Sequence, residues 1–243
     1  MSKHFKKYAL LLIAGLVICS MSCEKDSKSG GDNPDPKPDT GFVIEAKNVI
    51  GGNDNIATVK ASVWNEQSKE WDTIATGKYE NDGFKLTLPF TLNSEYLYTI
   101  GDEGFPEGVN VSNLNAKITL ESISFFACNE DGGEIGIVYC KGETSNNSVD
   151  ANYVYADRNF TITGTYTAVY GSTTEIVTLD YSLKKGWNTI YSRREESGGN
   201  CYYFTLTTKK PSDVTLEWKC RDWSPPSATT LQNKLFGEIL NNE

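Results

Sequence analysis

Short runs of alternating apolar and polar residues recur along most of the chain, divided by turns rich in glycine and asparagine. Alternation with a period of two is the pattern of a half-buried β-strand, and many short strands at this spacing are typical of antiparallel β-sandwiches. The sequence therefore predicts an all-β fold. The expected strands cover residues Phe42–Ile50, Ile56–Trp64, Asp72–Tyr79, Phe84–Pro89, Lys117–Cys128, Glu134–Cys140, Asn152–Tyr155, Phe160–Val169, Glu175–Leu183, Asn188–Ser192, Cys201–Thr207 and Val214–Cys220.

One helical pattern lies near the C-terminal end. Residues 230–240 follow two prolines and carry Leu231, Leu235 and Ile239 on one helical face at four-residue spacing. We treat residues 225–243 as a tail. Its short helix either docks on the folded domain or frays in solvent.

A polar segment, Gly142–Asp150, interrupts the strand pattern and predicts a linker. The expected domains are two antiparallel β-sandwiches, at residues 42–142 and 150–224. In the first, Ala57–Val63 and Gly77–Pro89 resemble transthyretin-like and carboxypeptidase-regulatory-like sandwiches, which carry a similar Asn/Asp-Gly-Phe turn before a strand ending in proline. The resemblance implies an immunoglobulin-like arrangement of strands.

The N-terminus has the three parts of a secretory signal: three lysines within residues 3–7, an apolar stretch at 8–18, and small residues leading to Cys23. The apolar stretch is too short to cross a bilayer. The layout resembles a bacterial lipoprotein signal, and its Ser-Met-Ser-Cys box is similar to the Bacteroidota type. That resemblance implies removal of residues 1–22 and lipidation of Cys23. The alternative is an ordinary secretory signal with an incidental cysteine.

Residues 23–41 contain no large apolar side chain between Cys23 and Thr40, so we expect a disordered tether between membrane and folded domain. The charged residues Glu24, Lys25 and Asp26 resemble those that follow the lipidated cysteine in lipoproteins exported to the outer face of the outer membrane. The expected location is therefore the outer membrane, with the protein held by lipid at the cell surface. A periplasmic orientation is the alternative.

Charge and histidine content exclude several classes of function. The chain has a net charge of −9, and removal of the signal lysines makes it more negative, which argues against binding nucleic acid. Its single histidine, His4, lies in the signal. Ser-His-Asp catalysis and histidine-ligated zinc sites are therefore excluded from the mature protein. We expect no metal or cofactor.

Four cysteines remain in the body of the chain: Cys128, Cys140, Cys201 and Cys220. Cys201 and Cys220 flank a predicted hairpin, and a register that pairs them would allow a disulfide. Matching the apolar faces of the two strands requires a register shifted by one residue, which a bulge could reconcile. Buried free thiols are the alternative.

The most distinctive candidate for recognition is the pair Trp64 and Trp71. If Asn65–Glu70 forms a turn, the two indoles pair across the strands on the polar face, opposite the core residues Val59, Ala61 and Val63. Exposed aromatic pairs with polar neighbours suit sugar stacking or a protein hot spot. A cross-strand pair that only clamps the hairpin is the alternative.

Acidic clusters at 102–107, 130–134 and 195–196 could supply calcium ligands or half of a glycosidase carboxylate pair, but solvated surface charge is the simpler interpretation. The first hypothesis for function is a non-catalytic surface lipoprotein that recognises a glycan or a protein. The second is a fimbrillin-like or pilus-associated structural subunit. A hydrolase that uses carboxylates alone is the third.

Overall fold

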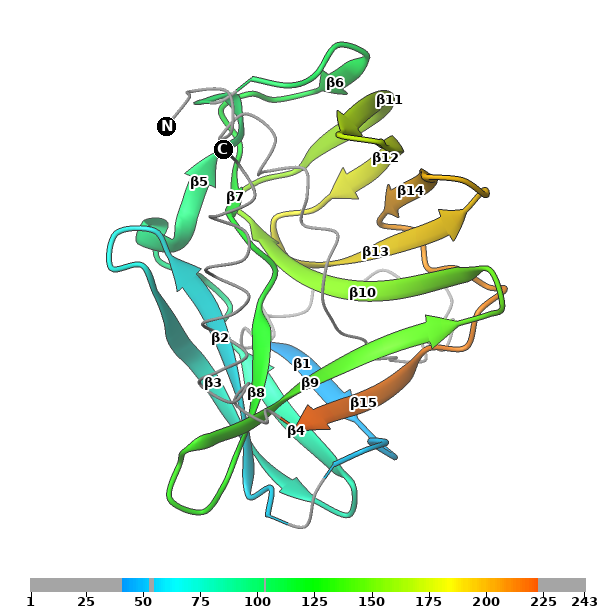
Figure 1. The fold of residues 1–243 in the computed structure, drawn as a ribbon. Coiled ribbons are helices and arrows are strands. Elements are labelled where there is room, and N and C mark those ends of the chain that lie inside the picture. The colour runs from blue at the N-terminus through cyan, green and yellow to red at the C-terminus, as the bar shows by residue number, and fades with distance from the viewer. Residues whose placement is uncertain (1–40, 53–54, 103, 223–243) are drawn as a thin grey trace, which may run out of the picture.

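The computed structural model describes residues 41–222, except 53–54 and 103 (Figure 1). This part of the chain is almost entirely β-structure, as predicted, with two single-turn 3-10 helices and no α-helix. The elements are β1 (Phe42–Ala46), β2 (Thr58–Asn65), β3 (Glu70–Glu80), β4 (Gly83–Leu88), η2 (Ser94–Tyr96), β5 (Leu97–Thr99), η3 (Ile100–Asp102), β6 (Val109–Val111), β7 (Lys117–Thr119), β8 (Ser124–Cys128), β9 (Glu134–Glu143), β10 (Asn147–Ala156), β11 (Phe160–Tyr170), β12 (Thr173–Leu183), β13 (Gly186–Glu196), β14 (Cys201–Thr207) and β15 (Glu217–Asp222).

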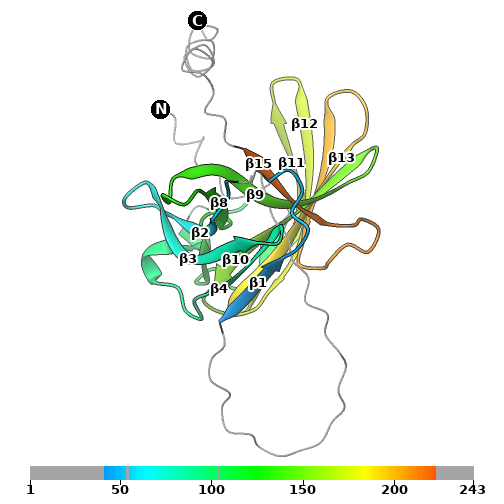
Figure 2. The same ribbon diagram turned by 90° about the horizontal axis from the view of Figure 1, so that it is seen from below.

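These strands form one large mixed sheet. Its order is β1-β4-β3-β2-β8-β9-β10-β13-β14-β12-β11-β6, with β15 added on the other edge of β9. Most neighbours are antiparallel, whereas β12 and β14 run parallel. Figure 2 shows the two ends of the arrangement, with β2, β3 and β8 on one side and β12 and β13 on the other.

Local sequence explains the turn between β3 and β4. Asn81 and Asp82 both have positive φ, as a two-residue hairpin turn of the primed type requires, and asparagine and aspartate tolerate that conformation better than most residues. Glu80 then pairs with Gly83. This is the Asn/Asp-Gly-Phe turn that the sequence pattern predicted.

A first core fills the space between β1, β2, β4, β8, β9, β15 and one face of β10. Its largest fully buried side chains include Tyr153 and Phe125, whose ring centroids lie 6.0 Å apart. Val59, Ala61 and Val63 of β2 point into it, as the alternation predicts. Trp218 of β15 completes this core. Its ring packs edge-to-face against that of Phe84, with 4.9 Å between the ring centroids.

A second core lies on the opposite face of β10. Val154 and Ala156 contact residues of β11, β12, β13 and β14 there, while Tyr153 and Tyr155 belong to the first core. Strand β10 is therefore buried on both faces and is shared by both cores.

The segment expected to be a linker is a hairpin. Gly142 pairs with Val149, and Asp150 pairs with Lys141, so β9 runs into β10 through a short turn. The last described strand, β15, returns to pair with β9. The structure thus shows one sheet with two cores and does not show two separate sandwiches.

Candidate functional site

The two tryptophans of the β2–β3 hairpin are paired as the sequence predicted. Trp64 lies directly opposite Trp71, and their ring centroids are 5.6 Å apart in an edge-to-face arrangement. A bulge beside Ala61 leaves Ile74 without a partner on β2, and this shift keeps both indoles on the face opposite the core.

A third ring extends this surface onto the next strand. Trp71 makes a second edge-to-face contact with Phe126 of β8, with 6.0 Å between ring centroids. We call Trp64, Trp71 and Phe126 the aromatic face. Phe126 is buried, whereas both indoles are half-buried and retain solvent-accessible surface. The contact with Phe126 is a packing role that the sequence pattern did not reveal, because β8 is about fifty residues away along the chain.

The turn beside the aromatic face is held by one buried side chain. The Asn65 amide oxygen accepts hydrogen bonds from the backbone N–H groups of Gln67 and Ser68 at 3.0 and 3.3 Å. Its amide nitrogen donates to Asp72 at 2.8 Å. These three bonds fix both ends of the turn and so help to set the position of Trp64 relative to Trp71.

Polar groups border the indoles. Trp64 Nε1 donates to the Glu66 carboxylate at 3.0 Å, and Lys69 forms an ion pair with the same carboxylate. Glu121 lies close enough for Glu66 to contribute to the raised pKa of its carboxyl, although burial is the larger cause. Thr73 is exposed, and its hydroxyl lies 3.4 Å from that of Ser62. Partly exposed indoles can stack on the apolar face of a sugar ring, and carboxylate and hydroxyl groups beside them can form hydrogen bonds with the hydroxyl groups of that sugar.

The predicted hairpin between Cys201 and Cys220 is wrong. Cys201 begins β14, which pairs with β12 and β13, whereas Cys220 lies on β15 beside Val138 of β9. The two thiols are therefore on strands that do not pair, and the disulfide expected from the hairpin has no basis. Cys128, Cys201 and Cys220 are free thiols, and Cys128, Cys140 and Cys220 are buried.

The described carboxylates of the acidic clusters do not assemble into an ion site. Within residues 41–222, leaving out 53, 54 and 103, no three histidine, cysteine, aspartate or glutamate side chains come together as a candidate metal site. The Asn129–Gly133 segment is a hairpin turn, in which Asn129 accepts hydrogen bonds through its side chain and backbone.

Several sequence predictions fall outside the described residues. These are the signal at 1–22, the lipidated Cys23 with its tether, and the tail at 225–243. Within the described chain, no helix has both the length and the hydrophobicity needed to cross a bilayer.

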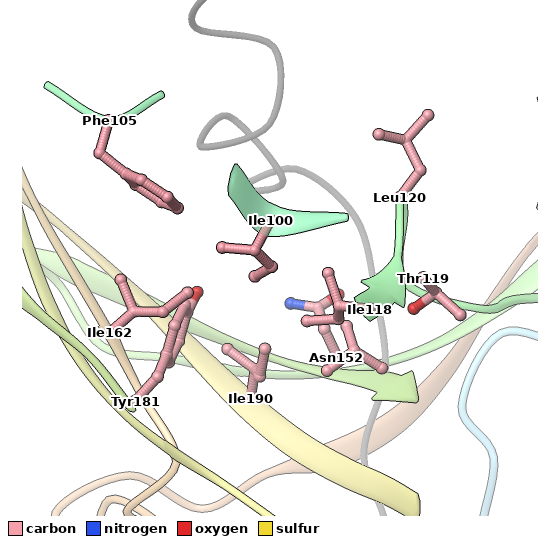
Figure 3. A pocket seen from close by; sticks show the side chains of 10 residues that line it. Ile100, Phe105, Ile118, Thr119, Leu120, Asn152, Ile162, Tyr181 and Ile190 are labelled. Carbon is pink, nitrogen blue, oxygen red and sulfur yellow. The ribbon is translucent and has the colours of Figure 1, made fainter. Parts of the chain in front are cut away.

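Sequence reasoning missed a small cavity beside the second core. Eight of its ten lining residues come from η3, β7, β10, β11, β12 and β13, and Phe105 and Leu120 lie in loops (Figure 3). The ten are Ile100, Phe105, Ile118, Thr119, Leu120, Asn152, Val154, Ile162, Tyr181 and Ile190. The signal available in the sequence was Asn152, a polar residue within the otherwise apolar and aromatic run Ala151–Ala156. Its position in a cavity depends on strands that are distant in sequence.

No family model matches the chain, no curated protein is similar to it in sequence, and no solved structure is similar to it in fold.

Proposed function

We propose that this protein is a non-catalytic recognition protein of the cell envelope, held by a lipid on Cys23, that binds a glycan at its aromatic face. The observation that carries the proposal is the fixed, partly exposed pair of Trp64 and Trp71 on the solvent side of the sheet. The N-terminal sequence supports the anchor.

The size of the aromatic face favours a sugar over a protein. Two half-buried indoles offer on the order of 100–200 Å² of accessible ring, since a whole aromatic side chain covers roughly 150–250 Å². A stable protein interface needs about 800 Å² on each partner. One or two sugar rings match the smaller area, and the Glu66 carboxylate and Thr73 hydroxyl are placed to bond to their hydroxyls.

A glycan array tests this proposal. The purified full-length chain is compared with a Trp64→Ala/Trp71→Ala variant, and with Tyr203→Ala, which removes an exposed aromatic from a distant strand. We expect the wild type and Tyr203→Ala to bind the same glycans, and the double variant to bind them at least ten-fold more weakly. Urea unfolding shows whether the double variant remains folded.

Equal binding by the folded double variant, or no glycan bound by the wild type, would contradict the proposal. A folded variant with Trp64→Ala alone distinguishes loss of the contact surface from loss of the Trp71–Phe126 packing, because it leaves both of those rings in place.

The anchor is tested separately by Cys23→Ser. We expect the substituted protein to leave the membrane fraction, and metabolic labelling with a radioactive fatty acid to label the wild type only. Membrane attachment that survives the substitution would argue against lipidation at this residue.

A further inference from the structure

The cavity beside the second core has a sheet on one side and a crossing segment on the other. Asn152, Val154, Ile162, Tyr181 and Ile190 rise from the sheet. Ile100 and Phe105 lie above it, and Ile118, Thr119 and Leu120 lie at its side, as Figure 3 shows.

The crossing segment is attached to the sheet at several points, so the cavity is a built feature of the fold. Strand β6 pairs with β11, and Ile118 of β7 pairs with Ala156 of β10. The close approach of β6 requires glycine at 164, because a Cβ there would lie 2.0 Å from the carbonyl oxygen of Gly108. Ile100 is held in turn by a 2.9 Å hydrogen bond from its N–H to Ala116.

Asn152 is the unusual residue of this cavity. It is 2% exposed, and neither its amide oxygen nor its amide nitrogen has a hydrogen-bond partner. Its amide points toward the space between Ile100 and Ile190 (Figure 3). Buried amides are nearly always hydrogen-bonded, because a missing partner is costly in the protein interior. The two unpaired atoms of Asn152 therefore indicate that the cavity holds an occupant that both donates and accepts hydrogen bonds.

A second polar group faces the same space. The Tyr181 hydroxyl points inward between Ile162 and Ile100, although the residue as a whole is partly exposed (Figure 3). Burial raises the pKa of this phenol, so the group is neutral and can donate a hydrogen bond. The Thr119 hydroxyl already accepts from the N–H of Tyr155 at 3.3 Å.

The remaining walls define the occupant further. None of the ten lining residues is charged, so the occupant is neutral, since an unpaired charge would be costly here. The enclosed volume is about 40 Å³. A water molecule needs roughly 10–15 Å³ in this measure, so the space holds a group of about three non-hydrogen atoms. Phe105 and Leu120 are half-buried and form the apolar mouth.

We propose that this cavity is a binding site for the carboxamide end of a small, uncharged and otherwise apolar molecule. The carboxamide group has three non-hydrogen atoms and matches the amide of Asn152 donor to acceptor and acceptor to donor. The apolar part of the ligand lies along Ile100, Phe105 and Leu120. Three buried waters would satisfy the polar groups less well, because each needs two to four polar partners and the walls supply few.

Hexanamide is the probe for this site, with hexanoate at pH 8 as its charged counterpart of similar size. In the ¹⁵N-labelled full-length chain, the side-chain amide signals of Asn152 are identified by their loss in Asn152→Leu. We expect hexanamide to shift these signals with saturation, and hexanoate to bind at least ten-fold more weakly.

Three variants establish the position of the site. Asn152→Leu is expected to weaken hexanamide binding at least ten-fold. Tyr181→Phe, which keeps the ring and removes the hydroxyl, is expected to weaken it about three-fold. The exposed Asn146→Leu serves as the matched control and should bind as the wild type does. Trp64→Ala/Trp71→Ala should also leave hexanamide binding unchanged, because the aromatic face lies on the other half of the sheet.

Signals of Asn152 that stay unmoved up to the solubility limit of hexanamide would overturn the proposal and identify the cavity as a water site only. Equal affinity of Asn152→Leu and wild type for hexanamide would overturn it as well. If Asn152→Leu does not fold, Tyr181→Phe decides, and an unchanged affinity in that variant counts against the site.

Discussion

At the scale of single residues, several buried groups keep their protons more firmly in the folded protein than in the unfolded chain. Burial raises the pKa of the Cys220 thiol from 9.0 to about 11, and the nearby Asp222 carboxylate adds to the effect. Burial also raises the pKa of the Tyr166 and Tyr181 phenols. All three belong to, or pack against, the two cores.

Because these pKa values are raised in the folded protein, we predict that the protein loses stability at alkaline pH. As pH rises above 9, the unfolded chain releases the Cys220 proton before the folded protein does, so the free energy of unfolding falls. The loss from this thiol is complete only once the pH exceeds about 11, and it amounts to about 2–3 kcal/mol. The tyrosines continue the decline above pH 10. Urea unfolding at several pH values measures the slope.

Cys220→Ala is the matched variant for this measurement. It should flatten the slope between pH 9 and 11 without removing the later decline, whatever its effect on stability at pH 7. An unchanged slope in the variant would show that another group dominates the alkaline transition.

The Trp64–Trp71 pairing could be predicted from sequence, because it depends on one hairpin and one alternating pattern. Asn65, which fixes that hairpin, has its partners within seven residues. The contact of Trp71 with Phe126 and the position of Asn152 could not be predicted, since both depend on strands brought together by the whole sheet.

At the scale of elements, strand β10 is longer in the structure than the sequence predicts. The sequence predicted a strand only at 152–155, whereas the structure extends it over Asn147–Ala156. The part that was predicted lies within Ala151–Ala156, which is buried on both faces and forms an apolar and aromatic run. The part that was missed begins with Asn147 and Ser148, which are polar and only partly buried, so the sequence there resembles a linker.

The double burial of β10 makes its side chains a test of the fold. Tyr153 is 1% exposed and contacts the rings of Phe42 and Phe125 at 5.8 and 6.0 Å. We expect Tyr153→Ala to lower the free energy of unfolding by about 3–5 kcal/mol, because it leaves a large cavity. Tyr203→Ala, on an exposed side of β14, should change it by less than about 1 kcal/mol. Similar losses in both variants would contradict the burial described for β10.

At the scale of the whole molecule, strand order departs from chain order. Consecutive strands are usually neighbours, and that rule produced the incorrect hairpin between residues 201 and 220. Instead, β14 joins β12 in parallel and β15 crosses back to β9. The backbone of Ile50 also bonds to β15, through Trp218 and Cys220 at 2.9 and 2.7 Å. Strands that are so far apart in the sequence leave no local sequence pattern that would predict their pairing.

Fragment 41–143 should therefore fail to fold by itself, although it contains β1 to β9. It lacks β10, β15 and the Trp218 side chain, all of which close the first core. We expect its amide spectrum to be poorly dispersed and its urea unfolding to show no cooperative transition, whereas the full chain unfolds cooperatively. A fragment that unfolds cooperatively would favour the two separate domains predicted from sequence.

The pairing of β15 with β9 also determines when the first core can be completed during folding. The first core contains residues from β1, near the start of the folded region, and from β15, at its end. A chain that emerges from a ribosome or an export channel N-terminus first cannot complete this core until residue 222 has appeared. The long loop that must close slows folding. The first strands of the folded region therefore stay incompletely packed until the last described strand has been released.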